Sequence, residues 1–416
     1  MPRFAHMSDI HIGAFRQPEL RGLVLAAFEA ALDRCVEEKV DFVILAGDIF
    51  DSNVPDLGTV SRAASKMKEA ADKGLRFYAI YGSHDFSPNY SSIVDVLDGA
   101  GLFRRAEEKE SGGGKVTLRF VEDPTGARIC GISGKKLSID REEYAMLDRQ
   151  ALEKETGFKV FVFHGGLDEM KPKSLEMMET MPASSLPAGF GYYAGGHIHG
   201  RDLRSLPGRP NVAFPGPLFA TDFTELLPLA HGEQRGFYLV DFDEGGVSQA
   251  QFVPVKVCDV IEVYCSAEGR PSTEVVRELM QTAEKADVGG KVVLLTVEGR
   301  LSRGKTSDVN LQAVRKRLYA SDPLIVLANQ SRLTSTEQVV APTVPRGQRV
   351  VERELFERGI AGVKSEVAAL RGEKGVSLAV GLLETLKEAR KENENKAEFE
   401  DRITAAGLAA MGLEEK

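Results

Sequence analysis

Tryptophan is absent from this 416-residue sequence, and cysteine occurs only four times. Without a C-x-x-C pair or a dense set of cysteines, neither a thiolate metal site nor a disulfide framework is expected. The four cysteines lie within apolar patterns, so we predict reduced, buried thiols in a cytoplasmic protein. They are Cys35, Cys130, Cys258 and Cys265.

A long hydrophobic run is also missing. No stretch of about 18 uninterrupted apolar residues occurs, so a membrane-spanning helix is not expected. The first residues, MPRFAHMSDIH, do not place a basic segment before an apolar one. We therefore predict neither a signal peptide nor a membrane partner.

The chain has no overall excess of positive charge, with 53 Lys and Arg against 62 Asp and Glu and a net charge of −9. This balance argues against a surface that is generally coated by DNA. A local basic groove is compatible with it, because binding follows the local field rather than the total charge. The length suits two or three domains, and a content of 43% hydrophobic and 28% charged residues is that of a globular protein.

The first half of the chain alternates short apolar strands with amphipathic helices. Strands are predicted at 3–8, 41–45 and 75–80, and helices at 18–39 and 56–73. This order predicts a parallel sheet with right-handed crossovers. Further predicted elements are helices at 91–99 and 142–156, and strands at 116–121, 127–132, 159–163, 189–194, 212–214, 236–242 and 248–255. We expect the last three strands to close the second half of the sheet antiparallel, which gives an α/β sandwich of two packed sheets.

The composition changes near residue 255 and again beyond residue 333, which predicts four parts. Residues 1–255 form the large domain, and 256–333 form a small β-α-β-α-β unit. Residues 334–349 are rich in Pro, Thr and Gln, as expected for a linker. Residues 350–416 are predicted to be helical and charged, with apolar stripes. This segment is short for a core of its own, so we expect its stripes to dock on another surface.

Side chains able to bind a metal follow five of the predicted strands. Asp48 comes after a buried-strand pattern and a glycine, so it is the residue best placed to join the others in one site. Residues i and i+2 of an extended segment point to the same side, which allows two ligands from each D-x-H or H-x-H pair. Imidazole and carboxylate without thiolate suit manganese, iron or zinc. The five sets are Asp9 and His11; Asp48 and Asp51; Ser83, His84 and Asp85; His164; and His197 and His199.

Each motif taken alone has a simpler interpretation. A single H-x-H is more often part of an ordinary strand than a metal site, and Gly-Asp after a strand is commonly a helix cap. Of the seven histidines, however, only His6 and His231 lie outside the five strand ends. Chance placement does not explain that distribution. We assign no functional role to His6, which suits a histidine of the core or of a sheet edge.

The ordered set D-x-H, GD-x-x-D, G-S-H-D, H-G and G-H-x-H resembles the signature of the calcineurin-like metallophosphoesterases. Finer details are similar to the double-strand-break-repair nuclease branch, which contains SbcD and the MRN-complex nuclease subunit. These details are GDIFD followed by Pro55, then YGSHDFSP, FHGG, GGHIHG, FPGPLFATDF and VVLLTVEGRL. The resemblance is strong over residues 4–225. It implies an α/β two-sheet sandwich metallophosphoesterase domain at 1–255, a small α+β capping DNA-binding domain at 256–333 and a helical C-terminal segment.

The resemblance also implies two manganese ions, with magnesium, iron or zinc as other candidates. The first would be held by Asp9, His11, Asp48 and His199, and the second by Asp48, His164 and His197, with Asp48 bridging. Ser83 occupies the position of a metal-binding Asn in the family, and its shorter hydroxyl would hold the second ion weakly. His84 corresponds to the histidine that protonates the leaving oxygen, Asp85 would orient it, and the role of Asp51 stays open.

By the same resemblance, the chain would be a metal-dependent exo- and endonuclease of double-strand-break repair that uses a hydroxide held by two metals. It would act on DNA ends as a homodimer formed by the helices near 56–73 and 91–99. The helical tail would dock on an SbcC-type ABC ATPase. DNA contacts are predicted at Arg300, Arg303, Lys305, Arg315 and Arg317, although a merely solvated basic face fits them equally well. Two alternatives stay open: another calcineurin-like phosphodiesterase or phosphatase, and a weakly active DNA-end-binding scaffold that results from Ser83.

Overall fold

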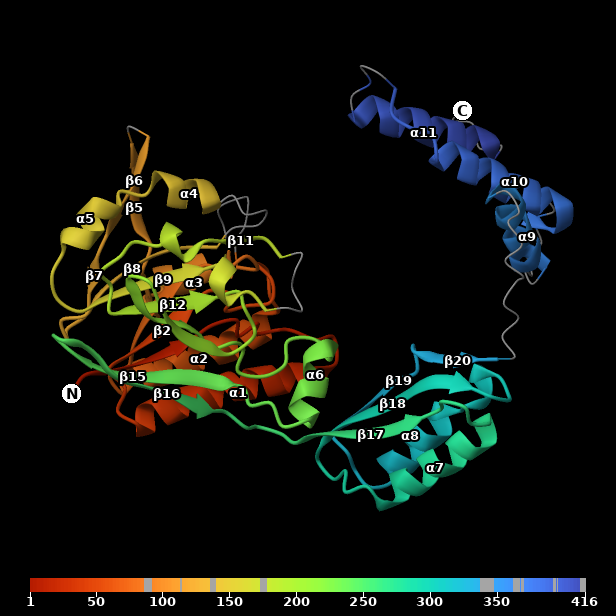
Figure 1. The fold of residues 1–416 in the computed structure, drawn as a ribbon, viewed down its shortest axis with the longest axis horizontal. Helices are drawn as coiled ribbons and strands as arrows, with labels where there is room; N and C mark the ends of the chain where they lie inside the picture. The colour runs from red at the N-terminus through yellow and green to blue at the C-terminus, as the bar shows by residue number, and fades with distance from the viewer. Residues whose placement is uncertain are drawn as a thin grey trace. The chain divides into compact units, whose positions relative to one another are not determined.

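The computed structural model describes residues 1–85, 92–112, 114–134, 140–172, 178–336, 348–361, 367, 370–391, 394 and 396–411. The chain divides into two compact units, Met1–Glu337 and Gln338–Lys416 (Figure 1). In the part of the chain covered by these ranges, no helix combines the length and the apolar character needed to span a bilayer.

Two six-stranded sheets make up most of the first unit. The first sheet runs, in spatial order, β16 (Gly246–Pro254), β15 (Gly236–Asp243), β1 (Arg3–Met7), β2 (Phe42–Ala46), β3 (Arg76–Ile80) and β4 (Arg104–Arg105). The second runs β13 (Asp202–Leu206), β14 (Arg209–Phe214), β12 (Tyr192–Gly196), β9 (Lys159–His164), β8 (Arg128–Ile132) and β7 (Val121–Glu122). The predicted parallel pairing of β1, β2 and β3 is confirmed.

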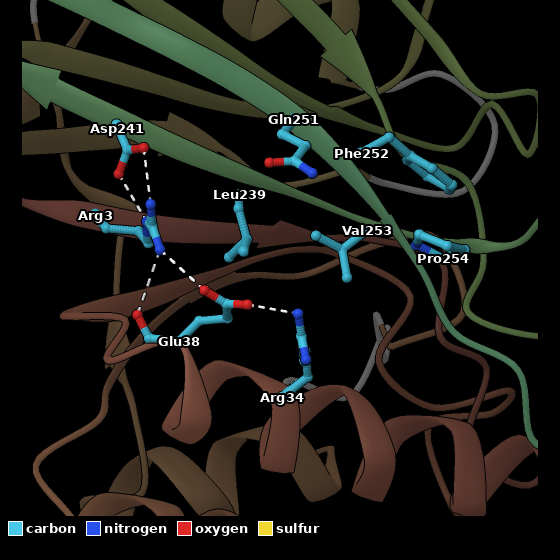
Figure 2. A pocket seen from close by; sticks show the side chains of 9 residues that line it. All are labelled: Arg3, Arg34, Glu38, Leu239, Asp241, Gln251, Phe252, Val253 and Pro254. Atoms are coloured by element: carbon cyan, nitrogen blue, oxygen red, sulfur yellow. Dashed lines mark hydrogen bonds and ion pairs between the residues drawn. The ribbon is translucent and has the colours of Figure 1, made fainter.

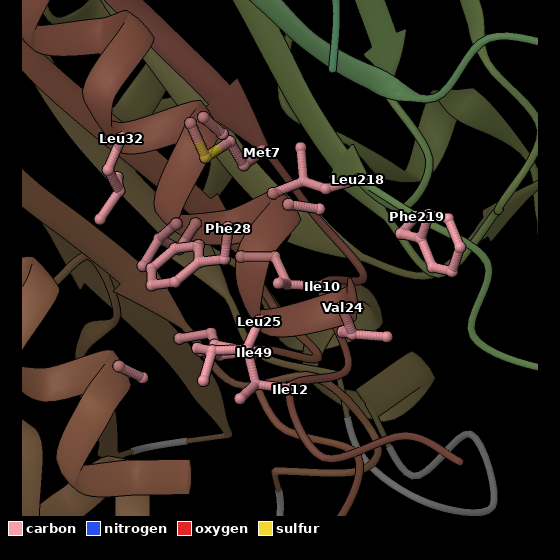
Figure 3. Packing of buried hydrophobic residues seen from close by; sticks show 14 of the residues in the cluster. Met7, Ile10, Ile12, Val24, Leu25, Phe28, Leu32, Ile49, Leu218 and Phe219 are labelled. Carbon is pink, nitrogen blue, oxygen red and sulfur yellow. The ribbon is translucent and has the colours of Figure 1, made fainter. Parts of the chain in front are cut away.

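Helices cover the outer faces of the sheets, which gives four layers. α1 (Pro18–Glu37) and α2 (Leu57–Asp72) pack on the first sheet, where Phe28 and Leu32 of α1 meet Met7 and Ile49 (Figure 3). α4 (Asp140–Met146) and α5 (Arg149–Lys154) supply core residues to the outer face of the second sheet. The predicted α/β sandwich is therefore confirmed. The shorter elements of this region are α3 (Ile93–Gly99), β5 (Glu108–Gly112), β6 (Lys115–Arg119), β10 (Gly166–Leu167), β11 (Thr180–Met181), the 3-10 turns η2 (Asp168–Met170) and η4 (Ala183–Ser185), and α6 (Phe223–Ala230).

The two sheets meet in an aromatic layer. Phe158, directly before β9 of the second sheet, stacks on Phe242 of β15 in the first sheet, with ring centroids 4.2 Å apart. His6 lies in the same layer, fully buried, with Nδ1 3.1 Å from the hydroxyl of Tyr192. Burial lowers the pKa of His6 to about 3, so its imidazole is neutral in the folded protein. The structure thus places this histidine in the core, and it belongs to none of the three groups of potential metal ligands among the described residues.

Three expectations about the sandwich are wrong in detail. β14 pairs parallel with β12, and it is β13 that adds the antiparallel edge. β15 and β16 extend the first sheet, because β15 satisfies the free backbone edge of β1. The helix predicted at 142–156 is broken between α4 and α5. At the break, the amide of Asp148 donates to the carbonyl of Val116 at 2.9 Å, and the side chain of Leu147 is buried.

A pocket of about 170 Å³ lies beside the end of α1 (Figure 2). Nε and Nη2 of Arg3 donate to the two carboxylate oxygens of Asp241 at 2.7 and 2.9 Å. Nη1 of Arg3 donates to Glu38 at 3.1 Å, and Arg34 pairs with the same glutamate. The charged groups of this pocket therefore satisfy one another. They join α1 to β1 and β15, which is a structural role.

Residues 256–333, called the module below, have a sheet of their own within the first unit. The sheet contains β17 (Val260–Ser266), β18 (Val292–Leu301), β19 (Ile325–Asn329) and β20 (Leu333–Ser335). The other three strands all pair with β18 in parallel. α7 (Ser272–Lys285) and α8 (Leu311–Tyr319) pack on one face around a separate core, and η5 (Thr306–Asp308) precedes α8. Val292, Leu294 and Ile325 belong instead to the core of the first sheet. The predicted strand and helix order is confirmed, and the module packs on the larger domain.

The second unit is helical in its described part. α10 (Gly372–Leu386) packs against α9 (Gln348–Ala361) and α11 (Lys396–Ala410). Leu355 and Leu386 are 60% and 70% exposed, so this unit presents apolar side chains to its surroundings. The predicted linker at 334–349 falls largely on 337–347, which lie outside the described residues.

The cysteine prediction is confirmed for three residues and modified for one. Cys35, Cys130 and Cys265 are buried and Cys258 is half-buried, and all four are free thiols. Burial raises the pKa of the Cys35 and Cys130 thiols well above the ordinary range, so both stay protonated.

Candidate metal centre

The predicted metal-site residues come together where five parallel strands end. β1, β2 and β3 deliver theirs from the first sheet, and β9 and β12 from the second. Backbone bonds hold the neighbouring loops in register: the amide of Asp9 donates to the carbonyl of Gly47, and that of His11 to the carbonyl of Asp48, both at 3.0 Å. The site therefore spans the seam between the two sheets, at their carboxyl ends.

Four of these residues adopt the left-handed backbone conformation that side chains disfavour. The φ angles are +53° at Asp9, +51° at His11, +50° at Asp48 and +88° at His197. Each such residue costs about 1–3 kcal/mol and persists only where its surroundings over-determine it. One such determinant is a bond from the amide of His197 to Oδ1 of Asp9 at 2.7 Å. Strain of this kind clusters at functional sites.

Glycines allow the loops to approach this closely. A Cβ on Gly82 would lie 2.1 Å from Oδ1 of Asp48. A Cβ on Gly196 would lie 2.1 Å from the carbonyl oxygen of Ala46. Any side chain at either position would displace the ligand loops.

The potential ligand atoms form overlapping groups. In each of three groups, the ligand atoms lie within 4.8 Å of one another: Asp9, His11 and His199; Asp48, His164 and His197; and His11, Asp48 and His84. The second group has the same residues as one predicted set, and the first group has the residues of the other predicted set except Asp48. Asp48 lies between them, with Oδ2 3.7 Å from Nε2 of His11 and 3.2 Å from Nε2 of His164.

The charges in the centre are strongly coupled. Burial opposes ionisation of Asp48, yet His164 and His11 hold its pKa well below the ordinary range. Burial alone would lower the pKa of His164, but Asp48 and Asp9 raise it to about 10. Burial and the charge of His164 lower the pKa of His197 to about 4. A cation that bound here would displace the proton of His164, because metal ligands must be deprotonated.

The residues fit a pair of divalent cations. Nε2 of His11 and Nε2 of His164 are buried and have no hydrogen-bond partner among the described residues. The contact of His164 with Asp48 is close enough for an ion pair but lacks hydrogen-bond geometry. Buried polar atoms of this kind are normally satisfied, and metal coordination would satisfy both. The mixture of carboxylates and imidazoles suits manganese, iron or zinc.

Ser83 faces the carboxylate shared by the two groups. Its hydroxyl donates to Oδ2 of Asp48 at 3.4 Å, a long hydrogen bond. The set around His164 and His197 therefore has three strong ligand side chains and one weak neighbour. The set around Asp9, His11 and His199 has those three plus the shared Asp48.

His84 stands exposed at the rim of the centre. Its amide donates to Oδ1 of Asp48 at 2.8 Å, and its ring lies 4.8 Å from that of His11. Nδ1 of His84 lies 2.8 Å from the backbone carbonyl oxygen of Asp51, to which it donates. The ring is thereby fixed with Nε2 free to meet a ligand.

The expected role of Asp85 needs correction. Its carboxylate accepts bonds from the amides of Ile49, Phe50 and Gly82 at 3.0–3.1 Å, so both oxygens are committed to the loops that follow β2 and β3. Burial and the charge of Asp48 raise the pKa of Asp85 to about 6. Asp85 thus shapes the loops, whereas the partner of the His84 ring is the carbonyl of Asp51.

Asp51, whose role the sequence left open, contacts two histidines of the centre. Oδ1 of Asp51 lies 3.2 Å from Nδ1 of His11, and its carbonyl oxygen accepts the bond from His84. One residue therefore orients both a potential metal ligand and the exposed histidine.

Two residues that the sequence analysis missed surround His199. Glu225 at the start of α6 lies 2.7 Å from Nδ1 of His199, and Arg235 donates to the carbonyl oxygen of His199 at 2.7 Å. Burial would raise the pKa of Glu225, but its bond with His199 and the charge of Arg235 lower it to about 2. The D-x-x-E spacing of Asp222 and Glu225 signals a helix start. It does not reveal that this glutamate points toward a histidine.

The predicted DNA-binding residues are divided between two elements of the module. Arg300, Arg303 and Lys305 are exposed at and just beyond the end of β18. Arg315 and Arg317 lie on α8 and are half-buried, and Nε of Arg317 pairs with Glu284 at 3.5 Å.

The family model of the calcineurin-like phosphoesterases matches residues 2–201 of this chain. Residues 2–201 are a calcineurin-like phosphoesterase domain. This calcineurin-like domain contains every predicted metal-site residue, together with His84 and Asp85. Glu225, Arg235 and the module lie beyond the matched range.

Curated relatives of the phosphoesterase domain include archaeal proteins. The DNA double-strand break repair protein Mre11 of Methanopyrus kandleri is 28% identical over 61% of this chain and 57% of its own length. Mre11 of Archaeoglobus fulgidus is 24% identical over 70% of this chain and 67% of its own. The uncharacterized metallophosphoesterase YhaO of Bacillus subtilis is 25% identical over 59% of this chain and 58% of its own. The match with Mre11 of Methanopyrus kandleri thus covers less than two thirds of the length of that protein.

Proposed function

We propose that this protein is a metal-dependent phosphodiesterase that cuts DNA in double-strand-break repair. The observation that carries the proposal is the position of Asp48 between two groups of imidazole and carboxylate ligands, with the exposed His84 beside it. A shared carboxylate can hold two cations at the separation needed to act on both the attacking and the leaving oxygen. The names of the archaeal relatives support DNA as the substrate.

Asp9, His11, His199 and Asp48 would hold one cation, and Asp48, His164 and His197 the other, with manganese the ion that we propose. When bound, the pair supplies an activated water and neutralises charge on the phosphoryl oxygens. Asp51 keeps the imidazole of His11 oriented toward its cation. Gly82 and Gly196 let the ligand loops pack closely enough to bring the two groups together.

His84 would complete the reaction by protonating the leaving oxygen. Its Nδ1 hydrogen is held by the carbonyl of Asp51, so Nε2 is the ring nitrogen left available to a substrate. As an imidazolium it would give the Nε2 proton to the oxygen that leaves phosphorus, and it would return to the neutral Nδ1–H form. The proton then comes back from water before the next cycle.

Surface features support the partners that we propose. Leu57 on α2 and Val96 on α3 are 76% and 62% exposed, which suits a homodimer formed through these helices. The exposed leucines of α9 and α10 suit docking of the tail on an SbcC-type ABC ATPase. Arg300, Arg303 and Lys305 would contact DNA phosphates from the module.

The test of this function uses the full chain with Mn²⁺ and three substrates: end-labelled linear duplex DNA, bis(p-nitrophenyl) phosphate and p-nitrophenyl phosphate. The proposal expects metal-dependent shortening or cutting of the DNA. Hydrolysis of bis(p-nitrophenyl) phosphate without any cutting of the DNA would favour a different phosphodiesterase. Hydrolysis of the monoester alone would favour a phosphatase.

A Ser83→Asn variant tests whether the second cation limits activity. The longer carboxamide can place an oxygen ligand where the hydroxyl only reaches Asp48, so we expect the weaker Mn²⁺ site to bind about tenfold more tightly. DNA cleavage at low Mn²⁺ should rise in parallel. Calorimetric Mn²⁺ titration and cleavage rates measure the two effects, with Ser83→Ala as the matched control that removes the hydroxyl. Tighter binding without faster cleavage would favour the DNA-end-binding scaffold.

A further inference from the structure

His199 is held from two sides by residues that come after the calcineurin-like match. Its ring nitrogen Nδ1 lies 2.7 Å from Oε1 of Glu225, which leaves Nε2 as the nitrogen available to the group of Asp9 and His11. Its backbone carbonyl accepts a 2.7 Å bond from Nη1 of Arg235. The orientation of this potential ligand therefore depends on α6 and on the residue before β15.

Glu225 is fixed to the first turn of α6. Asp222 caps the helix and accepts bonds from the amides of Thr224 and Glu225 at 2.7 and 3.2 Å. The second carboxylate oxygen of Glu225 accepts a 2.8 Å bond from the amide of Thr221. Only 12% of its side chain is exposed and both carboxylate oxygens are bonded, so Glu225 is held in place at the first turn of α6.

The other end of α6 contacts the module. His231, which ends the helix, lies 3.0 Å from Glu262 on β17 through Nε2. Arg235 is tied to the chain segment that enters the module, because its carbonyl accepts a 2.8 Å bond from the amide of Val255. Both residues that hold His199 are thus connected to the module, one through α6 and the other through Val255.

An open pocket lies at the junction. Its volume is about 450 Å³, and its lining includes Leu229, Arg235, Val255, Cys258 and Val260. The lining comes from the end of α6 and from the segment that enters the module, and this open space leaves the module room to shift against α6.

We propose that α6 couples the metal centre to the module, and that Glu225 is the positioning residue that transmits this coupling to His199. A displacement of β17 relative to the phosphoesterase domain moves α6, and Glu225 then turns the His199 ring into or out of line with its cation. Coupling is reciprocal, so metal binding restrains the junction. The inference rests on the proposed metal binding but not on the identity of the substrate.

Calorimetric Mn²⁺ titration of the full chain tests the positioning role. Glu225→Gln should weaken binding at the site of His199 by about 10- to 100-fold, the usual size of such losses. Glu233→Gln is the matched control. Glu233 pairs with Arg235 at 3.1 Å, and Glu225 pairs with it at 3.6 Å. Glu233 is not a partner of His199, so the Glu233→Gln variant should bind Mn²⁺ as tightly as the wild type. Equal affinity in wild type and Glu225→Gln would overturn the positioning role.

Hydrogen exchange measured by mass spectrometry tests the coupling. In the wild type, Mn²⁺ should slow exchange in α6 and in residues 255–262. In Glu225→Gln at saturating Mn²⁺, the loops at Asp9 and Asp48 should stay protected while 255–262 exchange as in metal-free protein. The coupling would be overturned if Mn²⁺ did not slow exchange of residues 255–262 in the wild type. It would also be overturned if Mn²⁺ slowed that exchange equally in Glu225→Gln. A wild type that binds no Mn²⁺ would instead overturn the proposed function.

Discussion

Asp48→Asn should strongly slow hydrolysis and weaken cation binding in both halves of the centre. The amide keeps the size of the carboxylate and can still accept the bond from the amide of His84, so the fold has no reason to change. It loses the negative charge that faces His11 and His164 at 3.7 and 3.2 Å. We expect the rate to fall by about 10⁴-fold, equivalent to about 5 kcal/mol of transition-state stabilisation. Mn²⁺ bound per chain, measured by elemental analysis after gel filtration, should fall from two to one or none.

Asp123→Asn is the matched control, because Asp123 is also a buried, paired aspartate. It accepts bonds from Nε of Arg76 at 2.7 Å and from the hydroxyl of Tyr78 at 2.8 Å. This variant should lower the free energy of unfolding by about 1–2 kcal/mol and leave Mn²⁺ content unchanged. Full Mn²⁺ content or full activity in Asp48→Asn would contradict the shared-ligand arrangement on which the proposed function depends.

Local patterns were sufficient to predict the parallel core of the first sheet and the set of residues that meet at the strand ends. The reason given for that convergence was only partly correct. Side-chain alternation along an extended segment was expected to direct Asp9 with His11 and His197 with His199. The backbone instead turns left-handed at Asp9, His11 and His197, and this conformation aims their side chains. The spacing was informative although the segments are not extended.

Features that depend on distant partners could not be predicted from the sequence. Whether β15 completes the first or the second sheet depends on which edge strand lacks a partner, and the local sequence of β15 does not reveal that strand. An aspartate after a histidine suggests a local pair, yet Asp85 accepts bonds from two amides of the loop after β2 and from the amide of Gly82 in its own loop. Glu225 has the sequence context of a helix cap, and only the fold brings it to His199.

His84→Gln should slow DNA cleavage by about 10²- to 10⁴-fold, the range of a positioned proton donor. Mn²⁺ affinity should stay close to that of the wild type, because His84 is exposed and its ring is bound to the carbonyl of Asp51. Steady-state cleavage and calorimetric Mn²⁺ titration separate the two quantities. The measurement also tests whether His84 is instead a metal ligand, because it forms a third group of potential ligand atoms with His11 and Asp48. A metal ligand at this position would lose affinity and rate together.

The leaving group provides an internal control for the same variant. A deoxyribose oxygen is a strong base that needs a proton as it leaves, whereas p-nitrophenolate leaves without one. Bis(p-nitrophenyl) phosphate should therefore lose little rate in His84→Gln while DNA loses most of its rate. Equal losses on both substrates would assign His84 to binding the phosphoryl group rather than to proton transfer. Since the Asp51 contact is a backbone carbonyl, side-chain changes at Asp51 should preserve this difference between substrates, even where they weaken the hold on His11.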